Sequence, residues 1–219
     1  MKIIFVEGMP GCGKSTLSDN LSAMLRDKGC ESCSYQELDK NHPISLFGEM
    51  KNGAHSIHYL EKDLSRWEIF VKSNSHKNDV HIFDAAPLQN SVRFAIEADY
   101  AERGSKYIKE MEKILTDVSS RLIYLRPDCP LQQTDFCVSD KGFVWGSKVS
   151  GYLQETDISK RQGWEGIAGM RQFWDYYVSI CDVLVEEVEM PKRIIRAVPG
   201  EWCRVQEEAF RFVYEETAL

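Results

Sequence analysis

The stretch Lys2–Ser15 decides the fold: it reads Lys-Ile-Ile-Phe-Val-Glu-Gly-Met-Pro-Gly-Cys-Gly-Lys-Ser. Its first part, Lys2–Glu7, is a short apolar run typical of a buried parallel strand. Its second part, Gly8–Ser15, matches the pattern G-x-x-x-x-G-K-[ST] of a phosphate-binding loop. An amphipathic helix is predicted over Lys14–Lys28, so the motif has the strand–loop–helix setting that it requires.

The residue types in this loop suit a chain of phosphates. Glycines permit unusual backbone angles, and backbone N–H groups at a helix N-terminus face an anion. We expect Lys14 to contact the β- and γ-phosphates as a catalytic residue and the Ser15 hydroxyl to ligate Mg²⁺, so ATP and Mg²⁺ are the predicted cofactors. The loop residues predicted to bind the nucleotide are Gly8, Pro10, Gly11, Cys12, Gly13, Lys14, Ser15 and Thr16.

A second magnesium ligand is predicted at Asp84. The apolar run Asp79–Asp84 ends in Phe83-Asp84, the Walker-B pattern, whose carboxylate holds Mg²⁺ directly or through water. The alternative is an aspartate that merely closes a strand-end turn. The sequence contains neither Asn-Lys-x-Asp nor Leu-Ser-Gly-Gly, which excludes a Ras-type GTPase and a transporter-type ATPase.

The rest of the chain alternates apolar runs with amphipathic stretches, which predicts an α/β fold with a parallel sheet covered on both faces by helices. The predicted strands are Lys2–Glu7, Glu31–Leu38, Asp79–Asp84, Arg121–Leu125 and Arg193–Val198. The predicted helices are Lys14–Lys28, Ile57–Val71, Val92–Arg103 (ended by Gly104), Tyr107–Val118, Ile167–Leu184 and Glu201–Tyr214. Four glycines, Gly142, Gly146, Gly151 and Gly163, interrupt the pattern between residues 128 and 163. We expect a functional loop or a lid that covers the substrate at residues 128–163, within a single domain spanning residues 1–219.

Composition narrows the class of protein. The chain has 219 residues, 43% of them hydrophobic, which suits one domain with an insertion. The net charge of −7 argues against a nucleic-acid partner, and no apolar run approaches the roughly 20 residues of a membrane span. The N-terminal residues lack the pattern of a signal peptide, and the seven cysteines are expected to be free thiols. We therefore expect a cytoplasmic protein whose partner is a small-molecule acceptor; a homodimer stays open.

The chain resembles the nucleoside/nucleotide kinase-like branch of P-loop kinases, which includes thymidylate kinase and antibiotic phosphotransferases. The resemblance rests on Val6–Thr16, on the strand end Ile82-Phe-Asp84 and on the implied strand order. Similarity to thymidylate-kinase-like P-loop proteins extends to Leu38–Pro43 and Leu88-Gln-Asn90. It implies a three-layer P-loop NTPase fold with five parallel strands, ATP–Mg²⁺ as donor, and a lid over the phosphates.

One departure from thymidylate kinases bears on the acceptor. Those enzymes carry Asp-Arg after the third strand, and the arginine helps to hold the acceptor phosphate. Here Asp84 is followed by Ala85-Ala86-Pro87, and the nearest cation, Arg93, lies about 13–14 Å further along if the segment is helical throughout. A neutral or cationic hydroxyl-bearing acceptor therefore fits better than a nucleoside monophosphate.

Acidic residues at strand ends are candidates for the acceptor site. Because ligands bind beyond the carboxyl ends of parallel strands, Glu37, Asp39 and Asp84 are expected to face one crevice. One of them would accept the proton of the attacking hydroxyl. Asp39 is favoured, since antibiotic and shikimate kinases of similar architecture use an acid near this position; alternatively it caps a loop. Further substrate residues are predicted at His42, Gln89 and Arg93, although His42 can simply close the turn, and Gln89 with Asn90 can cap a helix.

Cations of the lid are expected to neutralise charge during phosphoryl transfer. Lys160 and Arg161 are the favoured pair, with Arg161 catalytic and Lys160 on the nucleotide; Lys148 and Arg171 are weaker candidates. Arg126 either packs against the adenine or pairs with Asp128. A cluster of aromatic residues is predicted to line an acceptor pocket: Trp145, Tyr152, Trp164, Phe173, Trp174 and Tyr177. The alternative for the last three, which have helical spacing, is that they pack in the core.

The predicted function is ATP-dependent transfer of the γ-phosphoryl group to a hydroxyl of an antibiotic, an amino-acid-derived metabolite or a nucleoside-like compound. Two alternatives stay open. One is a nucleoside monophosphate kinase of the thymidylate kinase type. The other is a nucleotide-dependent regulatory ATPase that acts through a protein partner.

Overall fold

The computed structural model describes residues 1–37, 39–44, 58–198 and 200–214. Within these residues the strands form one parallel sheet in the order β2-β3-β1-β4-β5. Their bounds are β1 Lys2–Gly8, β2 Ser32–Tyr35, β3 Val80–Asp84, β4 Ser119–Pro127 and β5 Lys192–Ala197. The predicted five-stranded α/β fold is confirmed. The second strand is shorter than the predicted Glu31–Leu38, and Leu38 lies outside the described residues.

The central strand β1 is apolar because both of its faces are covered. Residues Ile3–Val6 are at most 1% exposed, as expected for a strand in the middle of a parallel sheet. Its register pairs Val6 with Asp84 of β3 and Gly8 with Leu125 of β4. The sheet therefore places Asp84 beside the point where the glycine-rich loop leaves β1.

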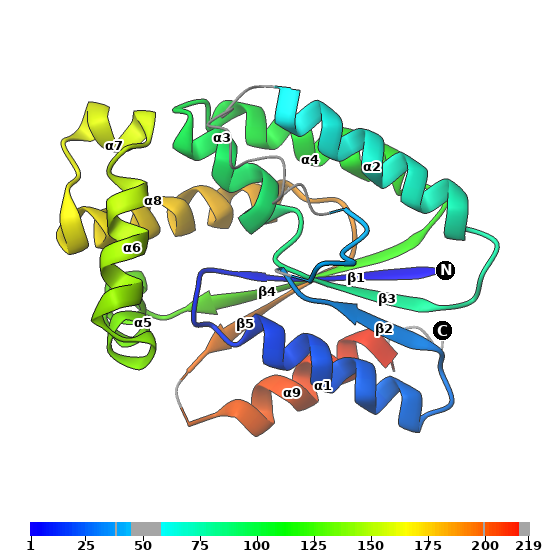
Figure 1. Ribbon diagram of the computed structural model, residues 1–219. Helices are drawn as coiled ribbons and strands as arrows, with labels where there is room; N and C mark the ends of the chain where they lie inside the picture. The colour runs from blue at the N-terminus through cyan, green and yellow to red at the C-terminus, as the bar shows by residue number, and fades with distance from the viewer. Residues whose placement is uncertain (38, 45–57, 199, 215–219) are drawn as a thin grey trace.

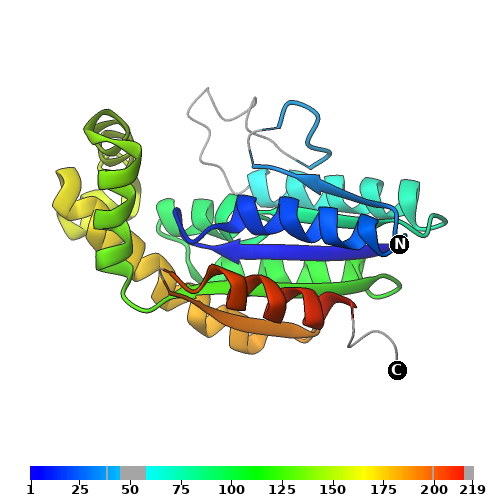
Figure 2. The same cartoon turned by 90° about the horizontal axis from the view of Figure 1, so that it is seen from below.

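Helices cover the two faces of the sheet (Figures 1 and 2). Helices α1 (Lys14–Asp27) and α9 (Trp202–Tyr214) lie together on one face. Helices α2 (His58–Asn74), α4 (Glu102–Ile114) and α8 (Gly166–Glu187) lie on the other. This is the three-layer arrangement that the alternating sequence pattern predicts.

The segment after β3 departs from the predicted helix Val92–Arg103. It forms a π-helical turn, η2 (Leu88–Val92), and then the short helix α3 (Arg93–Glu97). Gly104 does not end a helix; it lies inside α4, where an added Cβ would come within 3.1 Å of Val92 Cγ1. The glycine is needed for close packing between α4 and η2, which local sequence pattern does not reveal.

The loop expected between residues 128 and 163 is also wrong, because most of this region is helical, whereas its role as a lid stays a prediction. It forms α5 (Pro130–Lys141), α6 (Phe143–Leu153) and α7 (Asp157–Gln162), which lie beyond the carboxyl ends of the strands (Figure 1). Gly142 separates α5 from α6, but Gly146 lies within α6, and a Cβ there would come within 3.1 Å of Val138 and 3.2 Å of Ile167. This glycine serves helix packing rather than a loop.

Two further predictions concern single features. All seven cysteines are free thiols, as predicted. In the part of the chain that the structure describes, no helix combines the length and the apolar character needed to cross a bilayer.

Candidate active site

The glycine-rich loop between β1 and α1 is held from two sides. Gly13 has φ +85°, and an added Cβ would come within 2.7 Å of the Trp202 ring of α9. Gly11 has φ +81°, and a Cβ there would come within 2.2 Å of Cys137 Sγ on α5. The Cys137 thiol donates to the Pro10 carbonyl at 3.1 Å. Any other residue at these two glycines would be strained and would displace a packed neighbour.

Lys14, Ser15 and Asp84 meet at the end of this loop. Lys14 is 6% exposed, and its Nζ donates to the Met9 carbonyl at 3.2 Å. Ser15 Oγ donates to Asp84 Oδ2 at 2.5 Å. The structure thus brings together the residues predicted to bind phosphate and metal.

The Ser15–Asp84 pair fits a magnesium ion. Asp84 is 2% exposed, and its Oδ1 has no hydrogen-bond partner among the described residues. Burial raises the pKa of Asp84, while Lys14 and Ser15 oppose this effect. A buried carboxylate with a vacant oxygen beside a hydroxyl supplies the oxygen ligands that Mg²⁺ prefers. Elsewhere in residues 1–37, 39–44, 58–198 and 200–214, no cluster of three or more His, Cys, Asp or Glu side chains could hold a metal.

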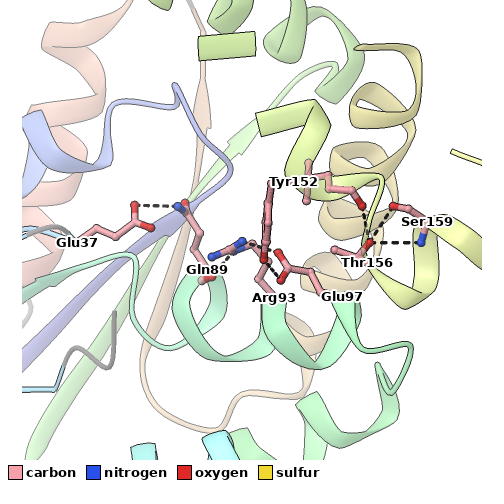
Figure 3. Close-up of polar contacts among 8 residues, drawn as sticks. Glu37, Gln89, Arg93, Glu97, Tyr152, Thr156 and Ser159 are labelled. Atoms are coloured by element: carbon pink, nitrogen blue, oxygen red, sulfur yellow. Dashed lines mark hydrogen bonds and ion pairs between the residues drawn. The ribbon is translucent and has the colours of Figure 1, made fainter. Parts of the chain in front are cut away.

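Glu37 and Gln89 lie next to this pair. Glu37 follows β2 and is half-buried, and its backbone N–H helps to lower the pKa of the nearby Asp84. Gln89 Nε2 donates to Glu37 Oε2 at 3.0 Å (Figure 3). Gln89 Oε1 and Asn90 Oδ1 are buried, and neither has a hydrogen-bond partner among the described residues. Buried amide oxygens of this kind are costly unless a ligand satisfies them.

Asp39 and His42 form a turn after β2. Asp39 is exposed, and its Oδ2 accepts a hydrogen bond from the Gln36 N–H at 2.9 Å. His42 is buried beside Phe83, and its Nδ1 accepts from the Ile44 N–H at 3.2 Å. Burial lowers the pKa of His42 to about 4. The contacts of both side chains are those of the turn-closing alternatives.

Arg93, the first residue of α3, lies against Gln89. Its Nε donates to the Gln89 carbonyl at 2.9 Å, and its guanidinium pairs with Glu97. Burial opposes the charge of Arg93, whereas Glu97 raises its pKa. Tyr152 of α6 donates to the other oxygen of Glu97. Figure 3 shows these side chains in a row that leads from Glu37 to Tyr152 of α6. Thr156, which follows α6, caps the N-terminus of α7.

The cations predicted for the lid lie in ion pairs away from the loop. Lys160 pairs with Glu155 at 3.2 Å, and Arg161 makes a bidentate contact with Asp99. The weaker candidate Arg171 pairs with Asp135 at 3.2 Å.

The predicted pairing of Arg126 with Asp128 is wrong. Arg126 Nε lies 3.0 Å from both carboxylate oxygens of Asp182, whereas Asp128 pairs with Arg196 at 2.9 Å. Of the aromatic residues, Phe173, Trp174 and Tyr177 lie in the core, as their helical spacing favours.

Sequence reasoning missed Glu7, the penultimate residue of β1. It is fully buried, and its carboxylate accepts from the Leu88 N–H at 2.5 Å and the Gln89 N–H at 3.2 Å. Burial raises its pKa to about 8, although these two N–H groups and Lys14 lower it. The sequence did offer one signal for a buried functional residue: Glu7 is a single acidic residue between the apolar run that ends at Val6 and the glycine at Gly8.

The fold, a five-stranded parallel sheet flanked by helices, is shared with solved structures of nucleoside and nucleotide kinases. Solved structures with this fold include YorR from Bacillus subtilis, in complex with phosphorylated GDP, at 13% identity and a TM-score of 0.53, covering 99% of this chain and 98% of that one. Deoxyadenosine kinase from M. mycoides with bound dATP is 15% identical with a TM-score of 0.52, covering 98% and 100%. Thymidylate kinase from Candida albicans is 17% identical with a TM-score of 0.54, covering 98% and 92%. No protein-family profile matches the sequence, and a search of curated proteins finds no match.

Proposed function

We propose that the protein is an ATP-dependent phosphotransferase that moves the γ-phosphoryl group of ATP to a hydroxyl of a small molecule. One observation carries this proposal: Lys14 and Ser15 of the phosphate-binding loop meet Asp84 of β3 beside Glu37, whose carboxylate accepts from Gln89 at 3.0 Å. Phosphoryl transfer needs a held donor and a positioned acceptor, because the attacking and leaving oxygens lie roughly in line.

On the donor side, the loop N–H groups and Lys14 bind the phosphates. Ser15 and Asp84 would hold Mg²⁺, which when bound offsets the negative charge of the phosphate oxygens. Lys160 and Arg161 can assist only after leaving Glu155 and Asp99, so we place neither of them in the site as it stands.

On the acceptor side, we propose Glu37 as the general base in preference to Asp39. Glu37 lies against Asp84 through its backbone and receives the Gln89 amide on its side chain. Asp39 is exposed, and one of its carboxylate oxygens accepts a hydrogen bond from the Gln36 N–H. A base must reach the hydroxyl that attacks the phosphate, and the position of Glu37 beside the donor residues suits this role.

We further propose that the acceptor is an uncharged, nucleoside-like molecule. Arg93 lies against Gln89, and Glu97 compensates its charge. An acceptor phosphate would have to compete with that ion pair. Gln89 Oε1 and Asn90 Oδ1 can instead accept hydrogen bonds from N–H or O–H groups of the molecule that is phosphorylated. One of the structures with this fold, deoxyadenosine kinase, is named for an uncharged nucleoside.

The test is a product screen by mass spectrometry. Purified protein with Mg²⁺ and ATP is incubated with separate pools of nucleosides, nucleoside monophosphates, aminoglycoside and macrolide antibiotics, and amino-acid derivatives. We expect one nucleoside pool to yield a product heavier by one phosphoryl group, and Lys14→Met to yield none. Products from the monophosphate pool alone would favour the thymidylate kinase type. ATP hydrolysis without any product, together with nucleotide-dependent capture of another protein, would favour the regulatory ATPase.

A further inference from the structure

The carboxylate of Glu7 joins the donor loop to the helix that carries Gln89. Glu7 directly precedes Gly8, the first glycine of the loop. Its Oε1 accepts from the Leu88 N–H and its Oε2 from the Gln89 N–H, so both oxygens are used on the same turn. The side chain is fully buried.

The two N–H groups that Glu7 satisfies are those that η2 cannot satisfy itself. Pro87 has no N–H group, and the N–H groups of Asn90, Ser91 and Val92 donate to the Ala85 and Pro87 carbonyls. The first N–H groups of a helix lack partners within it, so those of Leu88 and Gln89 need an outside acceptor. Their orientation fixes Gln89, whose side chain then meets Glu37.

Glu7 also adjoins the donor site, because it directly precedes the loop in the chain. The charge of Lys14 stabilises the Glu7 carboxylate, whereas the charge of Asp84 opposes it. Glu7 therefore links the end of β1, where the loop begins, to the turn that carries Gln89. Because it is buried and fully bonded, it has no oxygen left for a ligand.

We infer that Glu7 is a positioning residue that couples the donor loop to η2, the turn that carries Gln89. It sets the location of Gln89 relative to Lys14 without touching either substrate, so that occupation of the donor site orders the acceptor site. The inference rests on the proposed function, since it needs a donor nucleotide in the loop.

The test compares hydrogen exchange over residues 85–97 with and without Mg²⁺ and AMP-PNP, a non-hydrolysable ATP analogue. Glu7→Gln keeps the size of the side chain but turns an N–H donor toward a backbone N–H. Asp63→Asn is the matched control: Asp63 is also buried and accepts from Ser91 of η2, but its other donor is Tyr107 of α4 rather than a residue next to the loop. If both buried carboxylates merely supported η2, the two variants would behave alike.

In the wild type we expect AMP-PNP to slow exchange of residues 85–97 at least about threefold. In Glu7→Gln the analogue should still bind, with a Kd within about threefold of the wild-type value, but the slowing should disappear. In Asp63→Asn exchange should be faster without nucleotide, yet AMP-PNP should still slow it. Equal slowing in Glu7→Gln and the wild type, or equal loss in both variants, would overturn the inference.

Turnover provides a second readout. With the acceptor from the product screen, Glu7→Gln should lower kcat about tenfold while KM for ATP stays within about threefold, and Glu7→Asp, which keeps both oxygens, should recover part of the loss. If Glu7→Gln does not fold, Glu7→Asp takes its place in both measurements. If the wild type binds no AMP-PNP, the proposed function fails. The inference is then judged separately by exchange of residues 85–97 without nucleotide, where equal rates in Glu7→Gln and the wild type would overturn it.

Discussion

Lys14 is the buried cation of a site that also buries two carboxylates. Burial raises the pKa of Asp84 and of Glu7, and the charge of Lys14 lowers both. The ammonium group of Lys14 thus stabilises these buried carboxylates before any nucleotide binds. When phosphate oxygens enter the loop, the same positive charge is shared with them, which is the basis for expecting a severe effect of its removal.

The first prediction concerns this lysine. Lys14→Met keeps the aliphatic stem but removes the charge, and we expect phosphoryl transfer to fall at least about 100-fold because the phosphates lose their buried cation. Steady-state kinetics measure the loss, and a thermal melt with circular dichroism checks the fold. Lys106→Met, at an exposed lysine paired with Glu110, is the control and should keep wild-type rates. Near-normal turnover of Lys14→Met would refute the assigned donor site.

The second prediction separates the two acidic candidates for the base. Glu37→Gln should lower kcat by about 10²–10⁴-fold, because the hydroxyl loses its proton acceptor, whereas KM for ATP should change little. Asp39→Asn should leave kcat within about threefold, since that side chain contacts the Gln36 turn. The opposite ranking of the two variants would return the role to Asp39.

At the scale of elements, apolar runs and the loop motif predicted the five strands and α1 well. They did so because a buried parallel strand is a local pattern. The region from 128 to 163 was misjudged because Gly146 serves contacts with Val138 and Ile167, which lie on neighbouring helices. The bounds of the helix after β3 were misjudged because the π-helical turn η2 was not foreseen. That Glu37 and Asp84 lie close together could be predicted, because strand ends share one edge of the sheet. The contacts of Gln89 with Glu37 and of Glu7 with Leu88 could not, because no local pattern links these residues.

The third prediction uses two glycines of α6. Gly151 has no atom within 4 Å of an added Cβ, so Gly151→Ala should raise the free energy of unfolding by about 0.5–1 kcal/mol through helix propensity. Gly146→Ala gains the same propensity but must push against Val138 and Ile167, so it should give no net gain or a loss. Urea unfolding of both variants measures the difference. Equal stabilisation would mean that α5 and α8 do not pack on α6 as described.

At the scale of the whole molecule, buried titratable groups make stability depend on pH. Asp63 is fully buried and accepts from Ser91 and Tyr107, and burial raises its pKa to about 6 despite these bonds. The folded state therefore binds this proton more tightly than the unfolded chain does. This contribution is complete below about pH 4 and is lost as the pH rises through about 6.

The fourth prediction follows from that sign. Asp63→Asn removes the titration, so between pH 4 and pH 7 the variant should gain about 2–3 kcal/mol in unfolding free energy relative to the wild type. Urea unfolding of the two proteins at several pH values measures the change, and other groups such as His42 cancel in the difference. Parallel curves would show that Asp63 has an ordinary pKa in the folded protein.

The contact of Gly13 with Trp202 has a consequence for synthesis on the ribosome. The phosphate-binding loop is translated before the aromatic ring that supports it, because Trp202 belongs to α9. Cys137, which holds the loop from the other side, is also translated long after it. A nascent chain that displays the loop before α9 is synthesised therefore still lacks the support of Trp202. Nucleotide competence should therefore arise late, when α9 emerges, and partial chains should not sequester ATP.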